Sequence, residues 1–347
     1  MKRPVVLAII AAALFGAATP ASKLLLADLP MFQLAGLLYL GAAIGVAPAA
    51  WRSGGIRLPG RSDSLNRLRL LGAVVAGGIC GPLLYLFGLQ LAASASVSLW
   101  LNFEIAATAL LGVLFFRDHL GPLGWAGLVC ALAGALFLSL PSGASGLAAG
   151  GLVLAACLCW GLDNHLTALI DGITPSQSTF WKGLIAGVVN LSIGFLVASP
   201  SVKPLPIIAA LFVGIWAYGA SIVLYISSAQ ALGATRAQIA FASAPFFGVA
   251  LAVLVLGEAL NWIHLGSAVL FIAGVILMAV ERHTHFHSHG TLVHEHAHRH
   301  DDGHHDHDHP GLPRSTRHTH RHVHEPVAHA HAHWPDLHHR HEHDHES

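Results

Sequence analysis

An acid, an amide and an imidazole lie within an otherwise apolar run near the middle of this sequence. Trp160-Gly161-Leu162-Asp163-Asn164-His165 falls inside the run from Leu147 to Ile170. That run is long enough to cross a bilayer, because roughly 20 apolar residues at about 1.5 Å each span the hydrocarbon core. Ionisable groups at this depth are costly, and they usually pair with one another or handle a substrate. Two hypotheses follow: a transport site, or a structural ion pair that closes two helices.

A lysine in the next apolar run is the predicted partner of Asp163. Asp163 lies about ten residues before a turn near Ile173 and Lys182 about nine residues after it. On adjacent antiparallel helices the two side chains therefore reach similar depth. One charge alone would be buried without compensation, which costs several kcal/mol, so we predict that they form an ion pair. The pair is either a structural lock or a switch that substrate or a proton opens.

Glu104 is the second candidate for transport chemistry, with Asn102 beside it near the middle of the fourth apolar run. The residue 140 positions later is Ala244, which is followed by Pro245. At corresponding positions, one half thus has a carboxylate and the other has a broken helix. A binding site between two similar halves would need such an asymmetry. A desolvated carboxyl could contact the substrate or carry a coupling proton. We predict one of these roles for Glu104.

Other polar and aromatic residues are weaker candidates. Gln90 and Gln230 recur 140 positions apart and suit either hydrogen bonds between helices, which we favour, or a cavity lining. Tyr85 and Tyr225 could stack on an organic substrate or pack helices together. His165 is either a hydrogen-bonded core residue or a proton relay. The candidate substrate and coupling residues are Glu104, Asn102, Asp163, His165, Lys182, Tyr85, Gln90, Tyr225 and Gln230.

The composition requires a membrane to position these residues. The chain has 347 residues, of which 54% are hydrophobic and 10% charged, so a soluble domain of this size is excluded. Prolines inside the apolar runs mark expected kinks. Ten spans are predicted, and the first ends at Leu26. The other nine cover Met31 to Trp51, Leu70 to Leu91, Ser94 to Phe116, Gly121 to Leu140, Leu147 to Ile170, Ser176 to Ala198, Ile207 to Gln230, Thr235 to Leu256 and Trp262 to Val280.

The chain also repeats itself. At an offset of 140, Leu84-Tyr85 matches Leu224-Tyr225, and Asp118 corresponds to Glu258. Each half has five spans, and because five is odd the second half enters the membrane from the opposite face. The predicted fold is an all-α membrane protein of ten transmembrane helices in two inverted five-helix repeats, typical of carriers that alternate access around a midplane site. We assign residues 1–142 and 143–280 to the repeats and 281–347 to a tail.

The basic residues predict the orientation. Five arginines between residues 52 and 69 fall on one side together with the N-terminus, whereas the opposite side has only Lys203. We therefore expect a multi-pass protein of the cell (inner) membrane with both termini cytoplasmic.

Several motifs resemble the drug/metabolite transporter superfamily, specifically proteins with two EamA-type domains, over about residues 5 to 280. Phe15-Gly16 followed by Pro20 is similar to the family's first-helix pattern, and Trp160-Gly161 is similar to its second-half counterpart. Lys182 follows Pro175 by seven positions, as a basic residue commonly does in members, but the first half departs from the pattern. The resemblance implies a transporter of small metabolites. It leaves the substrate open, since members move amino acids, nucleosides, sugar phosphates, amines and other metabolites.

The tail differs in composition, because 24 of the 27 histidines follow Glu281. With few aliphatic residues and several prolines it cannot bury a core, so we predict disorder. Imidazoles among carboxylates suit Zn, Ni, Co or Cu. The candidate metal-binding residues are His283, His285, His287, His289, His294, His296, His298, His300, His304, His305, His307, His309, His338, His339, His341, His343 and His345.

Two function classes remain. The first, which we favour, is a secondary carrier, expected to be an exporter of a small organic metabolite, with a tail that senses or buffers metal. The second is a divalent metal exporter whose tail collects the ion. No nucleotide-binding loop is present, so the energy would come from a gradient. We expect no enzymatic activity, no required cofactor and no nucleic-acid partner. The expected partners are the lipid bilayer, a small-molecule substrate and metal ions, and formation of a homodimer stays open.

Overall fold

The apolar runs form helices in the computed structural model, which describes residues 2–116, 118, 120–140, 143–199, 203–280 and four short tail segments. Within this part of the chain ten helical stretches are long and apolar enough to cross a membrane, as predicted. They are Arg3–Leu25, Met31–Arg52, Ser64–Leu91, Ser94–Phe115, Pro122–Ser139, Gly143–Ala168, Pro175–Val197, Pro204–Leu232, Ala234–Leu256 and Trp262–Val280.

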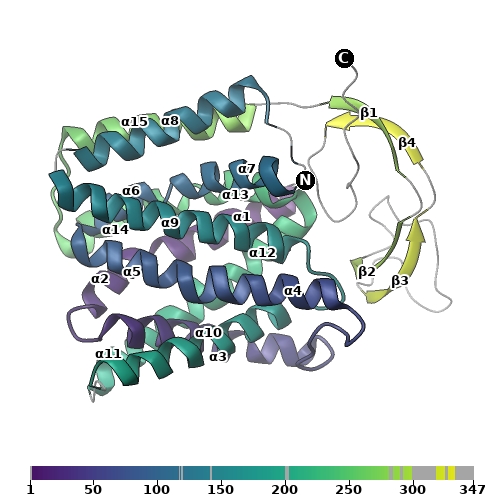
Figure 1. Cartoon of the computed structure of the whole chain (residues 1–347), viewed down its shortest axis with the longest axis horizontal. Coiled ribbons are helices and arrows are strands. Elements are labelled where there is room, and N and C mark those ends of the chain that lie inside the picture. Colours follow the sequence, from purple (N-terminus) through teal and green to yellow (C-terminus); the bar gives the residue numbers. More distant parts are fainter. Residues whose placement is uncertain are drawn as a thin grey trace.

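The two halves contain matching elements (Figure 1). The first half consists of α1 (Lys2–Gly16), α2 (Ala18–Leu25), α3 (Met31–Arg52), α4 (Ser64–Ala73), η1 (Val74–Cys80), α5 (Gly81–Leu91), α6 (Ser94–Trp100), α7 (Phe103–Phe115) and α8 (Pro122–Ser139). The second consists of α9 (Gly143–Ala168), α10 (Pro175–Val197), α11 (Pro204–Val213), η3 (Gly214–Ala220), α12 (Ser221–Leu232), α13 (Ala234–Phe241), α14 (Ala244–Leu256) and α15 (Trp262–Val280).

The irregular positions repeat together with the helices. The π-helical turns η1 and η3 each contain seven residues and begin 140 positions apart, at Val74 and Gly214. The fourth span of each half is broken, between α6 and α7 and between α13 and α14. Pro245 lies in the first turn of α14, after the break, where a missing N–H costs no hydrogen bond. Pro82 lies at the start of α5, which continues directly from η1. The register that the sequence predicted therefore recurs in the structure. One difference is that α1 and α2 are separate, whereas α9 is continuous.

Small residues let the two halves approach closely where α3 crosses α10. A Cβ on Gly183 would lie 2.7 Å from the Tyr39 carbonyl oxygen, and one on Gly187 would lie 2.7 Å from Leu40. Small residues at helix contacts are the usual device of membrane bundles, because packing rather than the hydrophobic effect drives association there. α8 and α15 pack similarly, with Gly127 against Gly274, and form one edge of the bundle (Figure 1).

Two carboxylates that correspond in the repeat also link the halves. The Glu258 carboxylate accepts hydrogen bonds from the backbone N–H groups of Ser94 (2.8 Å) and Ala95 (2.7 Å), at the start of α6. Its counterpart Asp118 accepts a hydrogen bond from the Thr235 hydroxyl (2.7 Å), at the start of α13. Each carboxylate follows the broken span of its own half and contacts the first turn of the broken span of the other. A negative charge at a helix N-terminus is favourable.

Replacing Glu258 with Gln should lower the free energy of unfolding by about 1 kcal/mol, because hydrogen bonds to a charged acceptor are roughly twice as strong as neutral ones. Denaturant titration of the purified protein in detergent measures the change. Asp28→Asn is the matched control, since Asp28 forms an exposed ion pair with Lys203 (2.5 Å) whose loss should cost little. Equal effects of the two variants would show that the contact of Glu258 with α6 is not stabilising.

The part of the tail that the structure describes consists of four short strands. β1 (Thr284–His289) pairs antiparallel with β4 (Val327–Ala332), and β2 (Leu292–His298) pairs antiparallel with β3 (His318–His324). The alternation of His with other residues in these segments has the period of two that a strand requires. Figure 1 places both pairs beyond the end of the bundle at which the N-terminus lies.

Candidate substrate and coupling site

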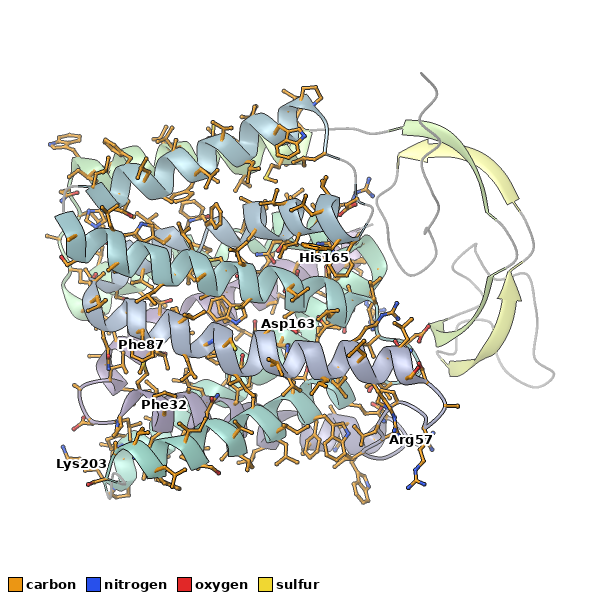
Figure 2. The ribbon with its side chains drawn as sticks, viewed as in Figure 1. Phe32, Arg57, Phe87, Asp163, His165 and Lys203 are labelled. Atoms are coloured by element: carbon orange, nitrogen blue, oxygen red, sulfur yellow. The ribbon has the colours of Figure 1, made fainter. Side chains whose placement is uncertain are left out.

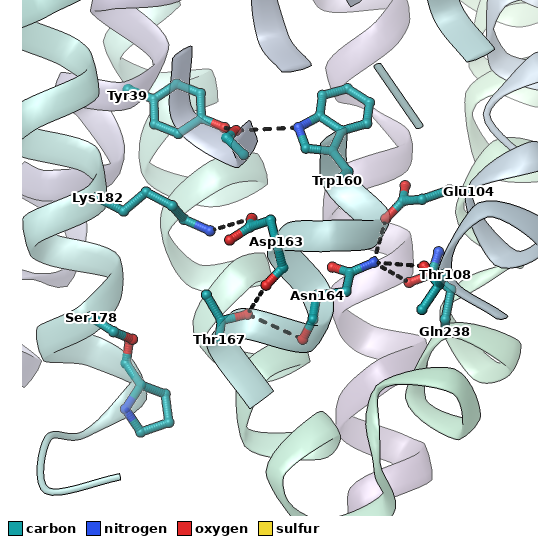
Figure 3. A network of polar contacts seen from close by, with 12 residues as sticks. Tyr39, Glu104, Thr108, Trp160, Asp163, Asn164, Thr167, Ser178, Lys182 and Gln238 are labelled. Carbon is teal, nitrogen blue, oxygen red and sulfur yellow. Dashed lines mark hydrogen bonds and ion pairs between the residues drawn. The ribbon is translucent and has the colours of Figure 1, made fainter. Parts of the chain in front are cut away.

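The predicted ion pair between Asp163 and Lys182 is confirmed. Lys182 Nζ donates a hydrogen bond to Asp163 Oδ2 at 2.6 Å, and both side chains are buried. Asp163 lies on α9 and Lys182 on α10, near the centre of the bundle (Figures 2 and 3). The geometry follows from the antiparallel hairpin that the two helices form.

The turn between these helices is defined by local chemistry. Thr174 caps α10: its hydroxyl accepts a hydrogen bond from the Gln177 N–H, and its own N–H donates to the Gln177 side chain (2.9 Å). Gly172 has φ +74°, a left-handed conformation that glycine adopts without strain. Together the cap and the turn fix where α10 begins, and therefore the depth at which Lys182 meets Asp163.

Glu104 lies in the first turn of α7, directly after the break in the fourth span. Its Oε1 accepts a hydrogen bond from Asn164 Nδ2 at 3.0 Å. The same amide nitrogen lies 3.2 Å from Thr108 Oγ1 and 3.3 Å from Gln238 Oε1, so three acceptors surround one NH₂ group (Figure 3). Among the residues that the structure describes, Glu104 forms no ion pair. Glu104 and Asn164 belong to different halves, so the contact crosses the repeat interface.

A central cavity of about 50 Å³ joins these groups. Its lining includes four residues of the predicted site, Glu104, Asp163, Lys182 and Tyr225, together with Asn164. Most of the remaining wall is aromatic: Phe15, Tyr39, Trp160, Tyr218 and Phe241. The rings form a connected cluster, with Phe15 centred 6.1 Å from Trp160, 5.7 Å from Tyr218 and 5.5 Å from Phe241. The cavity therefore combines charged and amide groups with flat apolar walls.

The other predicted residues lie outside the central cavity. His165 is buried, with Nε2 2.8 Å from the Thr108 carbonyl oxygen and its ring stacked on Phe116. Tyr85 does not line the cavity, and its ring centre lies 5.6 Å from that of Trp160. Gln230 donates a hydrogen bond to the Ile170 carbonyl (3.0 Å), whereas Gln90 is exposed.

Asn102 also lies apart from the central cavity, because the helix break separates it from the side of α7 that faces Asn164. Its amide donates to the Leu99 carbonyl at 3.1 Å, and its side chain lines a second, smaller cavity of about 10 Å³. Glu104 lines this second cavity as well. Glu104 thus lines both cavities.

A glycine that the sequence did not single out accommodates the ion pair. A Cβ at Gly77, in η1, would overlap the Asp163 carboxylate. The Gly77 carbonyl accepts hydrogen bonds from the Tyr39 hydroxyl and from Trp160 Nε1 (3.3 Å). A π-helical turn displaces carbonyls from the usual ladder, and such turns occur frequently at functional sites. The Gly77-Gly78 pair inside an apolar run was the available sequence signal.

The predicted metal site of the tail falls outside what the structure describes. Most of the predicted ligands lie outside the described residues: His283, His300, His304, His305, His307, His309, His338, His339, His341, His343 and His345. For His285, His287, His289, His294, His296 and His298 only the backbone of the strands is described. In the part of the chain with described side chains, no group of three or more His, Cys, Asp or Glu residues could hold a metal ion.

Comparison with known proteins gives three findings. Residues 2–140 and 148–280 each match the family model of EamA-like transporters. A curated relative from Methanothermobacter thermautotrophicus, named an uncharacterized transporter, is 28% identical over an alignment of 221 residues that covers 61% of this chain. The match covers 64% of that relative, so the chain spans less than two thirds of its length. A solved crystal structure aligns with a TM-score of 0.60 over 80% of this chain and 98% of its own, at 17% identity, a likeness that shows the fold alone.

Proposed function

Because the chain belongs to the EamA-like transporter family, with both of its repeats matched, we propose that it is a secondary carrier that exports a small organic metabolite by alternating access. Glu104 is the group that exchanges a coupling proton in this proposal. The observation that carries it is the buried contact of Glu104 with Asn164 across the repeat interface, at the wall of the central cavity. Carriers built from inverted repeats bind their solutes at this interface.

The cavity supports an organic solute as the cargo. Aromatic rings suit the apolar part of a metabolite, while Glu104, Asp163 and Lys182 suit its polar groups. A cavity of about 50 Å³ is much smaller than the roughly 300 Å³ or more of usual ligand sites, so substrate entry requires the halves to move apart. Substrate that interacts with Asp163 or Lys182 could open the ion pair and thereby couple binding to that movement.

The orientation proposed for this carrier places both termini in the cytoplasm. Arg57 and Lys203 lie at opposite ends of the bundle, and Arg57 shares its end with the start of the chain (Figures 1 and 2). Arg69 lies there too, since its side chain donates to the Leu169 carbonyl (2.8 Å) beside the turn that precedes α10. The positive-inside rule assigns the arginine-rich end to the cytoplasm.

A divalent metal exporter is the second candidate, supported by the 24 histidines that follow Glu281. In this alternative the tail collects the ion at the cytoplasmic mouth, and imidazole suits Zn, Ni, Co and Cu. Under the favoured proposal the same tail binds metal as a sensor or buffer. The two candidates differ in what leaves the cell, which makes them separable by direct measurement.

Cells that express the full chain should contain less of one organic metabolite, and Glu104→Gln should abolish that decrease because the amide cannot release a proton. The test measures the metabolite and metal contents of four kinds of cell. They express the full chain, a truncation after Val280, the Glu104→Gln variant, or no protein. The truncation should still export the metabolite. A fall in Zn, Ni, Co or Cu that requires the tail would instead establish the metal exporter. Unchanged export and pH dependence in Glu104→Gln would contradict the coupling role.

A further inference from the structure

A column of buried polar side chains leads from one end of the bundle to Glu104. Ser94, Ser98 and Asn102 are spaced four residues apart, so they lie on one face of α6 and its continuation into the break. Their exposures are 0%, 0% and 1%. Ser94 Oγ, Ser98 Oγ and Asn102 Oδ1 have no hydrogen-bond partner among the described residues. Buried oxygens of this kind are usually satisfied, so three in one row require an explanation.

The second cavity lies along this column. Ser98, Asn102 and Glu104 line it, together with Thr19 on α2. Its volume of about 10 Å³ is close to the minimum that one water molecule occupies, and a buried water needs two to four polar partners. The side chains that line the cavity supply that number. The site therefore has both the size and the polarity of a water site.

The column has a direction, which follows from its two ends. Ser94 is the first residue of α6, where Glu258 accepts a hydrogen bond from its backbone N–H. α6 lies at the end of the bundle opposite the N-terminus (Figure 1). Glu104 lies at the other end of the column and also lines the central cavity. The corresponding positions of α13 are Ala234, Gln238 and Ala242, so the second half has no equivalent column.

We propose that Ser94, Ser98 and Asn102, with water in the second cavity, form a proton path between Glu104 and the membrane face at which Glu258 lies. This inference rests on the proposed carrier function, for which it supplies the route of the coupling proton. A hydronium ion at that face gives up one proton, which passes along the waters and hydroxyls, and the Glu104 carboxylate becomes a carboxylic acid. Release follows the same steps in reverse, and no other reactant takes part.

The groups around Glu104 determine which side chain accepts the proton at the inner end of the path. α1 and α13 face it with Phe15 and Gln238, which do not titrate. Asp163 is held by Lys182, and the His165 ring contacts a backbone carbonyl, so neither is positioned to take the proton from the second cavity. The titratable or charged side chains around Glu104 are Cys157, Asp163, His165, Lys182, Tyr39 and Tyr225.

Gly248 provides a way to close the path without changing a polar group. It lines the second cavity, and a Cβ there would lie 2.6 Å from Ser98 Oγ and 3.1 Å from the Gly16 carbonyl oxygen. Gly248→Ala therefore adds a methyl group to the wall of the second cavity, and the Ser98 side chain must shift to make room for it. Ser98→Ala is the complementary variant, because it removes one oxygen of the column and adds no volume.

The test follows Glu104 itself after a pH jump applied to the purified full chain, with the proton as the ligand. Infrared difference spectra report the carboxyl, and the band absent from Glu104→Gln identifies it. Gly248→Ala and Ser98→Ala should each slow protonation by roughly tenfold or more, the effect of losing one buried hydrogen-bonding position. Ser98→Thr should keep the natural rate, because it retains a hydroxyl at this position of the column.

Two controls match the variants in kind. Ser267→Ala also removes a buried hydroxyl without a partner in the described structure, but it does so on α15, none of whose residues lines the second cavity. Gly151→Ala adds a methyl to α9 where nothing lies within 4 Å. Both should protonate at the natural rate.

Unchanged rates in Gly248→Ala and Ser98→Ala would overturn the path, as would equal slowing in the controls or the absence of any band that depends on Glu104. These outcomes leave the carrier proposal intact, because the pH jump involves no transported solute. Conversely, slow protonation in both variants combined with undiminished export by Glu104→Gln would retain the path and remove its role in coupling.

Discussion

Replacing Lys182 alone with Met should lower the free energy of unfolding by about 3–5 kcal/mol, because it leaves Asp163 as a buried charge without its partner. The 2.6 Å contact and the burial of both side chains make this the largest electrostatic effect that we expect in the bundle. Titration with a denaturing detergent, followed by the loss of helical signal, measures the change. Asp163→Asn should be destabilising as well, since it leaves the ammonium group of Lys182 buried.

The double variant Asp163→Asn with Lys182→Met should recover most of the lost stability, because replacing a whole buried pair by neutral groups is often nearly neutral. A double variant as unstable as Lys182→Met would show that volume, not charge, causes the loss. Export by the folded double variant then separates the two roles of the pair. Natural export would identify a structural lock, and loss of export would identify a switch.

Replacing Gly77 with Ala should abolish export and lower the free energy of unfolding by up to about 3 kcal/mol, the cost of adding volume to a packed interior. The added methyl group would overlap the Asp163 carboxylate, so either η1 or the ion pair must shift. A shift of η1 would also disturb the Gly77 carbonyl, which accepts hydrogen bonds from Tyr39 and Trp160 at the cavity wall. Export assays and the same detergent titration test both effects.

Gly151→Ala is the control for this variant, because Gly151 is a helical residue of α9 with open space around its Cβ position. There the substitution should stabilise by about 1 kcal/mol, since alanine has the higher helix propensity. The two glycine variants are therefore expected to change stability in opposite directions. Natural export by Gly77→Ala would mean that the ion pair tolerates displacement and that its position is not critical.

Much of the site was predictable because hydropathy and helix rise act along the chain. The depth of Asp163 and Lys182 followed from their distances to one turn, and the structure confirms their pairing. The isolated acid in an apolar span identified Glu104, although its contact with Asn164 needed the structure. Asn102 lies only two residues before Glu104, yet it lines the second cavity and not the central one.

Residues whose role depends on rotation about a helix axis were not predictable. Gln90 and Gln230 correspond in the repeat, but one is exposed and the other bonds the Ile170 carbonyl. In a span that is apolar on every side, the sequence carries no stripe that says which face is buried. For the same reason Tyr39, Tyr218 and Phe241 could not be assigned to the cavity wall before the helices were packed.

The sequence by itself determined that this protein crosses the membrane ten times, that its two halves repeat in inverted orientation, and that an acid and a lysine meet between two of its helices. These properties depend on hydropathy, on counting and on the rise of a helix, all of which are local. Only the tertiary structure decided which side chains share a cavity, that Glu104 lines two cavities, and that Glu258 reaches the other half. Those features depend on how each helix is rotated and which helix it crosses, and close packing of small residues sets both.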